Sequence, residues 1–73
     1  MSLRIGVDGR ILAGLHEGSF VRFRDDAEQT GGYLVLIVND LVAPTDGADY
    51  WVADRAELER FAADAEWRIA WGE

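Results

Sequence analysis

Few side chains in this 73-residue chain could carry nucleophilic or acid–base chemistry. His16 is the only histidine, and the sequence contains neither cysteine nor lysine. Nucleophilic catalysis needs a hydroxyl or thiol beside a base, and no serine and acid close in sequence complete such a set with His16. We therefore interpret His16 as a solvated loop residue and predict no catalytic residue.

Carboxylates are the second group of candidate functional side chains, because they can bind metal ions. Asp25, Asp26 and Glu28 lie close together in the sequence. Asp46 and Asp49 lie in a later stretch, which also contains the only proline of the chain. Hard cations such as calcium prefer oxygen ligands of this kind. The spacing nevertheless matches no complete calcium-binding loop, so the sequence predicts no metal and no cofactor.

Charge is distributed unevenly along the chain, whose formal net charge is −7. Residues 1–24 hold four arginines and two acidic residues, whereas residues 25–73 hold three arginines and twelve acidic residues. An acidic surface repels phosphate backbones at long range and attracts cationic proteins. We therefore expect no nucleic-acid binding, and we expect a basic protein to be the more suitable partner.

The length of the chain predicts a single domain over residues 1–73. A core of this size barely outweighs the entropy of ordering the chain, and without cysteine no disulfide can stabilise it. The sequence has no apolar run of about 20 residues and no apolar amino-terminal segment typical of a signal peptide. We expect a soluble cytoplasmic protein without membrane contact.

Alternating apolar residues predict the strands of the first half. Leu3, Ile5 and Val7 alternate with polar residues or glycine before an Asp8-Gly9 pair, which predicts a tight hairpin to a second apolar strand. Residues 19–26 predict a third strand. Residues 33–38 (YLVLIV) are apolar throughout, and we expect them to form the central strand.

The second half predicts a strand at residues 50–53, a helix and a final strand at residues 67–71. Asp54 is a good N-cap and Glu57 follows three residues later, so the helix is expected to begin near Arg55. An apolar stripe at helical spacing should pack on the sheet. Its members are Leu58, Phe61, Ala62 and Ala65.

These elements predict an α+β fold. We expect an antiparallel sheet of five or six strands, either open or curled, with one major helix at about residues 55–65 between the last two strands. Trp67 and Trp71 share a face with Ile69 and should lie beneath the helix, whereas Trp51 could face either the core or a partner. Because residues 33–38 are apolar on both faces and one helix covers only two or three strands, we predict a homodimer. A sheet that closes on itself is the alternative.

The pattern of these residues resembles a known class of proteins. Gly31-Gly32-Tyr33-Leu34 enters an apolar strand, Tyr50-Trp51-Val52 follows, Leu58 and Phe61 lie on a helix, and Trp67, Ile69 and Trp71 come at the end. This arrangement, over roughly residues 20–71, resembles small bacterial immunity proteins found beside polymorphic toxins, and also uncharacterised proteins of similar size. The resemblance implies a single-domain protein that binds and blocks a toxin, and it implies no catalytic residue.

We therefore predict a non-enzymatic protein-binding domain, an immunity-type inhibitor of a basic partner toxin. The alternative is a small-ligand-binding or catalytic module whose site forms at a homodimer interface. An enzyme would need convergent polar groups in a pocket, and the sequence offers mainly arginines and carboxylates. The predicted partner-binding residues are Asp25, Asp26, Glu28, Asp46, Asp49 and Trp51.

Overall fold

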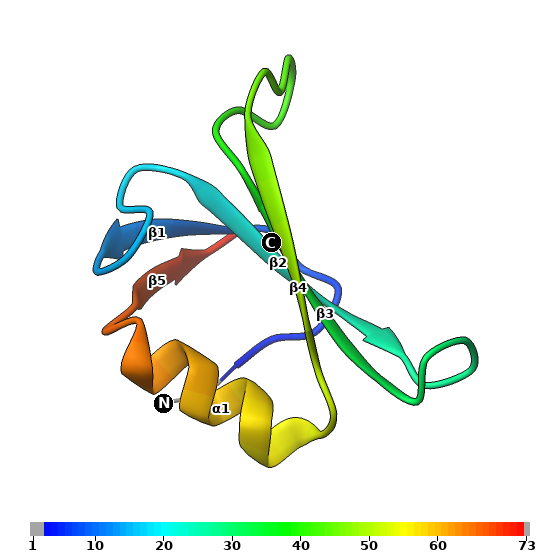
Figure 1. The fold of residues 1–73 in the computed structure, drawn as a ribbon. Coiled ribbons are helices and arrows are strands. Elements are labelled where there is room, and N and C mark those ends of the chain that lie inside the picture. The colour runs from blue at the N-terminus through cyan, green and yellow to red at the C-terminus, as the bar shows by residue number, and fades with distance from the viewer. Residues whose placement is uncertain (1–2, 73) are drawn as a thin grey trace.

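A computed structural model describes residues 3–72 and shows an α+β fold for them (Figure 1). In this part of the chain five antiparallel strands form one sheet, and a single helix packs on it. The strands lie in the order β4-β3-β2-β1-β5 across the sheet. The elements are β1 (Gly9–Ala13), β2 (Phe20–Asp26), β3 (Gly32–Val38), β4 (Gly47–Val52), α1 (Arg55–Asp64) and β5 (Arg68–Trp71).

Helix α1 joins the two edges of the sheet. It lies after β4 in the chain and leads to β5, and these two strands occupy opposite edges. The helix therefore does not lie between neighbouring strands but crosses one face of the sheet, as Figure 1 shows. Because β4 and β5 do not pair, the sheet formed by residues 3–72 is open, and it does not close on itself.

The predicted hairpin around Asp8-Gly9 is wrong. Residues 3–7 form no strand, although one parallel bridge joins them to β2. Neither Asp8 nor Gly9 has the positive φ that the tight turn requires. Gly9 instead begins β1 opposite Trp71, and a Cβ at residue 9 would lie 2.8 Å from the Trp71 ring. This glycine makes room for the Ile69 and Trp71 side chains of β5 and does not form a turn.

The hairpin near the amino terminus lies one strand later than predicted, between β1 and β2. Its loop has positive φ at Gly14, His16 and Gly18. The predicted strand at residues 19–26 is confirmed as β2, and residues 33–38 are confirmed within β3. The central position belongs to β2, however, because β5 adds to the sheet beside β1 and leaves β3 next to the edge.

The helix begins where the sequence predicted. The Asp54 carboxylate accepts a hydrogen bond of 2.9 Å from the Glu57 backbone N–H, and the Glu57 carboxylate accepts one of 3.1 Å from the Ala53 N–H. The first bond satisfies a backbone donor that the first helical turn leaves unpaired, and the second fixes the residue before the N-cap to that turn. No helix in residues 3–72 is long and apolar enough to cross a membrane.

Aromatic and aliphatic side chains fill the core between the helix and the sheet. The Phe23 ring centroid lies 6.1 Å from that of Trp67 and 5.7 Å from that of Trp71, distances typical of favourable aromatic pairs. Trp67 is buried, and its Nε1–H donates to the Leu15 carbonyl. The predicted core role is confirmed for Trp67, and Trp71 is partly buried and packs against the core. The buried apolar residues are Leu3, Ile11, Val21, Phe23, Val35, Ile37, Val52, Leu58, Ala62 and Trp67.

Candidate protein-binding surface

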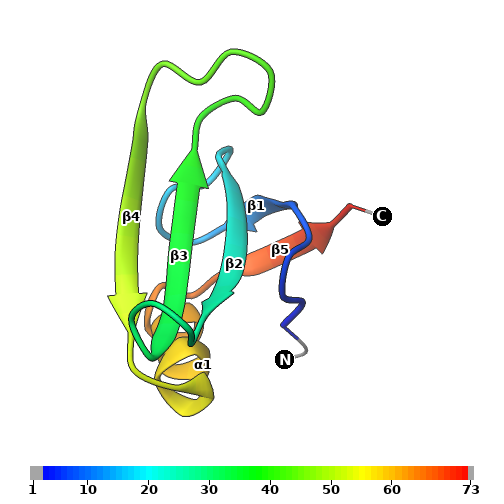
Figure 2. The ribbon, with the colours of Figure 1, turned by 90° about the vertical axis from the view of Figure 1, so that its right-hand side faces the viewer.

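The sheet has a second face that carries no helix. Along β3, Val35 and Ile37 are buried on the helix side, whereas the alternating Leu34, Leu36 and Val38 are only partly buried. Figure 2 views β2, β3 and β4 from the side opposite α1, which lies behind them. We call this side the outer face. Its residues on these three strands are Phe20, Arg22, Arg24, Leu34, Leu36, Val38, Gly47, Asp49 and Trp51.

Strand register arranges the outer face in three rows. Each row has an apolar β3 residue in the middle, a β4 residue on one side and a β2 residue on the other. Two arginines lie on the β2 side, and an aspartate and a tryptophan lie on the β4 side, so the two halves of the face differ in chemistry. The rows are Trp51–Leu34–Arg24, Asp49–Leu36–Arg22 and Gly47–Val38–Phe20.

Trp51 is the most exposed ring on this face, with 50% of its surface accessible. Its Nε1–H donates a 2.9 Å hydrogen bond to the Thr30 hydroxyl, which fixes the indole above the β2–β3 turn. A Cβ at Gly32 would lie 2.7 Å from the Trp51 Nε1, so the ring rests directly on the glycine backbone. Trp51 is therefore a positioned but accessible aromatic group, the kind that interfaces use as an anchor.

Strand β4 is an open edge of the sheet. The Asn39 backbone N–H donates to the Asp46 carbonyl, so every second residue from Asp46 onward bonds to β3 in the antiparallel ladder. The N–H and C=O groups of Gly47, Asp49 and Trp51 consequently point away from the sheet. No other segment within residues 3–72 bonds to them. An edge of this kind can accept another strand.

The β2–β3 turn holds the acidic cluster predicted at residues 25–28. Asp25 caps the turn by accepting a hydrogen bond from the Ala27 N–H, and Glu28 is exposed. Asp26 is only 7% exposed, and its carboxylate lies 3.5 Å from the Arg24 guanidinium. Asp26 therefore supports the turn and offers little surface to a partner, whereas its two acidic neighbours are accessible.

The fold separates the predicted site residues into two groups. Asp49 and Trp51 share the outer face, and Trp51 is hydrogen-bonded to the turn that carries Asp25 and Glu28. Asp46 lies at the far end of the β3–β4 pair, roughly 20 Å along the strands from that turn. Among residues 3–72, no ion pair involves the carboxylates of Asp25, Glu28, Asp46 or Asp49. These charges are available to a cationic partner.

A different acidic residue, Asp40, organises the β3–β4 loop. Its carboxylate accepts hydrogen bonds from the backbone N–H groups of Val42 and Ala43, at 2.8 and 3.3 Å. These bonds lower the pKa of Asp40 below its ordinary value of 3.8 because they stabilise the charged form. Leu41 beside it borders a hollow with Phe20, Arg22 and other outer-face residues, so the loop flanks this face.

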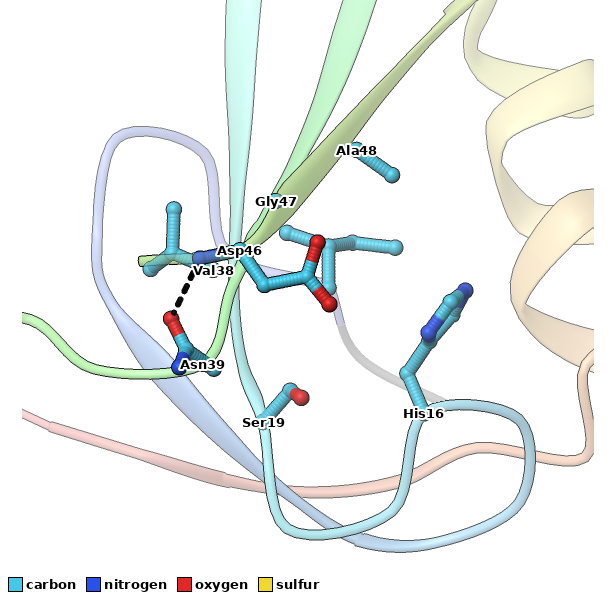
Figure 3. Close-up of a pocket in the computed structure, with 8 residues that line it drawn as sticks. His16, Ser19, Val38, Asn39, Asp46, Gly47 and Ala48 are labelled. Carbon is cyan, nitrogen blue, oxygen red and sulfur yellow. Dashed lines mark hydrogen bonds between the residues drawn. The ribbon is translucent and has the colours of Figure 1, made fainter. Parts of the chain in front are cut away.

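A small hollow near His16 is the only place where the described fold brings together the residue types of nucleophilic catalysis. His16, Ser19 and Asp46 approach a space of about 200 Å³ (Figure 3). The sequence had given no sign of this arrangement, because the loop of one hairpin and the end of another strand pair supply the residues. No hydrogen bond joins these three side chains within residues 3–72, so nothing activates the hydroxyl. Within residues 3–72 no group of three or more histidine, aspartate or glutamate side chains is placed to hold a metal ion.

Comparisons of the chain with protein-family models, with curated proteins and with solved structures found no match. The functional argument consequently depends on the surface itself. Arg22 and Arg24 are the charged outer-face residues that the sequence-based prediction of the site omitted. Their alternation with buried residues placed them on one face, but only the pairing of β2 with β3 reveals that they lie level with Asp49 and Trp51.

Proposed function

We propose that this protein is a non-enzymatic protein-binding domain that binds a basic partner along β4, as an immunity-type inhibitor of a toxin would. The observation that carries the proposal is the chemistry of β4, an open edge strand that presents the accessible Trp51 beside Asp49, which forms no ion pair within residues 3–72. Interfaces commonly combine an aromatic anchor with charges that guide the partner. The exposed carboxylates of Asp25, Glu28 and Asp46 extend the acidic character toward both ends of the strand.

The charge of the whole chain supports a basic partner. A formal net charge of −7 attracts a cationic protein from beyond contact distance, and this attraction raises the association rate more than the final affinity. Salt should therefore slow association strongly. The β4 backbone supplies the second component, because an extended segment of the partner can hydrogen-bond to the open edge.

The experiment compares the proteins captured by the tagged wild-type chain with those captured by Trp51→Ala and by the double variant Asp46→Asn/Asp49→Asn. Glu59→Gln/Asp64→Asn is the matched control, because it removes two exposed charges from α1. A basic protein should bind the wild type and the control but not the β4 variants. Production of that protein alone should stop cell growth, and coproduction of the chain should restore it. If every captured protein binds the β4 variants equally well, the proposal is wrong.

A small-ligand-binding or catalytic module completed by a second subunit is the other candidate function. The hollow bounded by His16, Ser19 and Asp46 favours it, since these residue types can act together once a hydrogen bond aligns them. The NMR signals of the His16 ring test this candidate. Addition of a ligand or an increase in protein concentration should change the histidine signals, and signals that stay constant under both conditions would argue against it.

A further inference from the structure

We propose that the outer face of the sheet binds a second copy of the same chain, with the two sheets stacked face to face. The proposal goes beyond the binding of a basic partner and does not depend on it. Its basis is the arrangement of the three rows, each of which carries complementary groups at its two ends. A symmetric dimer needs a patch that is complementary to itself, and the outer face has this property.

The two-fold axis of the proposed dimer runs parallel to β3, between the stacked sheets. Rotation by 180° about this axis keeps each row level with the same row of the second copy. It also exchanges the β2 side for the β4 side. Each β3 residue therefore faces its own counterpart, and the leucines at positions 34 and 36 form an apolar centre that excludes water.

The same rotation pairs opposite charges. Asp49 of one copy faces Arg22 of the other, and the reciprocal pair forms because the interface is symmetric. In the next row Trp51 faces Arg24, and a guanidinium over an indole ring is a favourable cation–π contact. In the third row the ring of Phe20 faces a glycine at position 47, so a large side chain meets the residue that leaves the most room.

Charge also distinguishes this orientation from the other face-to-face arrangement. If the axis ran across the strands at the level of the middle row, each strand would lie over its own copy with the order of the rows reversed. Asp49 would then face Asp49, and Arg22 would face Arg22. Like charges directly opposite one another destabilise an interface, whereas opposite charges fix its register. The parallel axis is therefore the arrangement that the surface favours.

The size of the face sets the expected strength of the dimer. Three strands about 4.8 Å apart and three rows about 7 Å apart define a plan area of roughly 300 Å². A standard stable interface buries about 800 Å² on each partner. We therefore expect a weak, reversible dimer that is monomeric at about 10 µM and mainly dimeric near 1 mM.

Charge-reversal variants test the pairing directly. Arg22→Asp and Asp49→Arg each place two repulsive pairs in the homodimer and should each weaken self-association at least about tenfold in sedimentation equilibrium. An equimolar mixture of the two variants restores both attractive pairs. The mixture should therefore dimerise to within about threefold of the wild type. Arg60→Asp, on the exposed surface of α1, is the matched control and should leave the dimer unchanged.

Folding of each variant is checked by circular dichroism, because Arg22 also forms a 2.8 Å ion pair with Asp8. If Arg22→Asp does not fold, Arg22→Gln replaces it, and about a threefold weakening is expected. A wild-type chain that remains monomeric at 1 mM overturns the proposal. A dimer whose stability does not change in Arg22→Asp also overturns the proposal. Such a dimer would form by pairing of two β4 edges, which does not involve Arg22 because β2 is the central strand of the sheet.

The same variants separate this proposal from the proposed function. Arg22 takes no part in binding a basic partner, so Arg22→Asp should lose the dimer and keep the partner. Asp49 serves both interfaces, because a basic partner would place its cations where the second copy places Arg22. If the wild-type chain forms the dimer but captures no basic partner, the proposed function is wrong and the dimer proposal stands.

Discussion

Replacement of Leu58 by alanine tests the packing of the helix most severely. Leu58 lies on the sheet-facing side of α1 and is fully buried, where it packs within the same core cluster as Phe23 and Trp67. Truncation of such a leucine typically costs about 2–5 kcal/mol through lost transfer energy and the cavity that remains. A domain of this length is expected to have only about 4–11 kcal/mol of stability in total. The variant should therefore lose a large share of its stability.

Urea unfolding followed by far-UV circular dichroism measures this loss. With a slope of about 1 kcal/mol per molar urea, the midpoint should fall by at least about 2 M. Leu58→Met conserves volume and should cost less than about 1.5 kcal/mol. Phe61→Ala should cost less than the value of about 3–5 kcal/mol for a fully buried ring, because Phe61 is only partly buried. A midpoint that does not move in Leu58→Ala would refute the assignment of the helix to this face of the sheet.

Three further predictions concern the ends of the helix and the β3–β4 loop. Asp54→Ala should lower the free energy of unfolding by about 1 kcal/mol, because it removes the bond to the Glu57 N–H; an unchanged urea midpoint would contradict this role. Glu66 follows the helix with a φ of 57°, a left-handed conformation that favours glycine, so Glu66→Gly should raise the melting temperature. The Asp40 carboxylate should titrate below pH 3.8 in an NMR experiment, because its backbone bonds favour the charged form. Its stabilising effect on the folded chain should be complete above the unfolded pKa and disappear as the pH falls through the lowered value.

The parts of the fold that local signals determine could be predicted from the sequence. The helix begins after Asp54 because the cap and Glu57 lie within one turn of each other, and short-range chemistry settles such boundaries. Strands β2 and β3 were predicted for a similar reason, since side-chain alternation or a short apolar run needs no knowledge of distant residues. The approximate bounds of these elements therefore follow from the residues themselves.

The role of Gly9 and the order of the strands could not be predicted because they depend on long-range packing. The Asp8-Gly9 pair has the composition of a tight turn, yet Gly9 is required by the close approach of Ile69 and Trp71, which come from the other end of the chain. The position of β2 at the centre of the sheet depends on the same addition of β5 beside β1. Turn composition alone could not distinguish a glycine that permits a positive φ from one that permits close approach of a side chain.

The candidate surface, too, could be predicted only in part from the sequence. Apolar residues on both faces of residues 33–38 indicate that something must cover each face, and that inference needs only the sequence. The composition of the neighbouring strands decides what can cover the second face. Register places Arg22 and Asp49 on either side of Leu36, a relation between residues far apart in the chain. The proposed two-fold dimer rests on this apolar centre with opposite charges on its two sides, and the proposed binding of a basic protein rests on the exposed acidic edge.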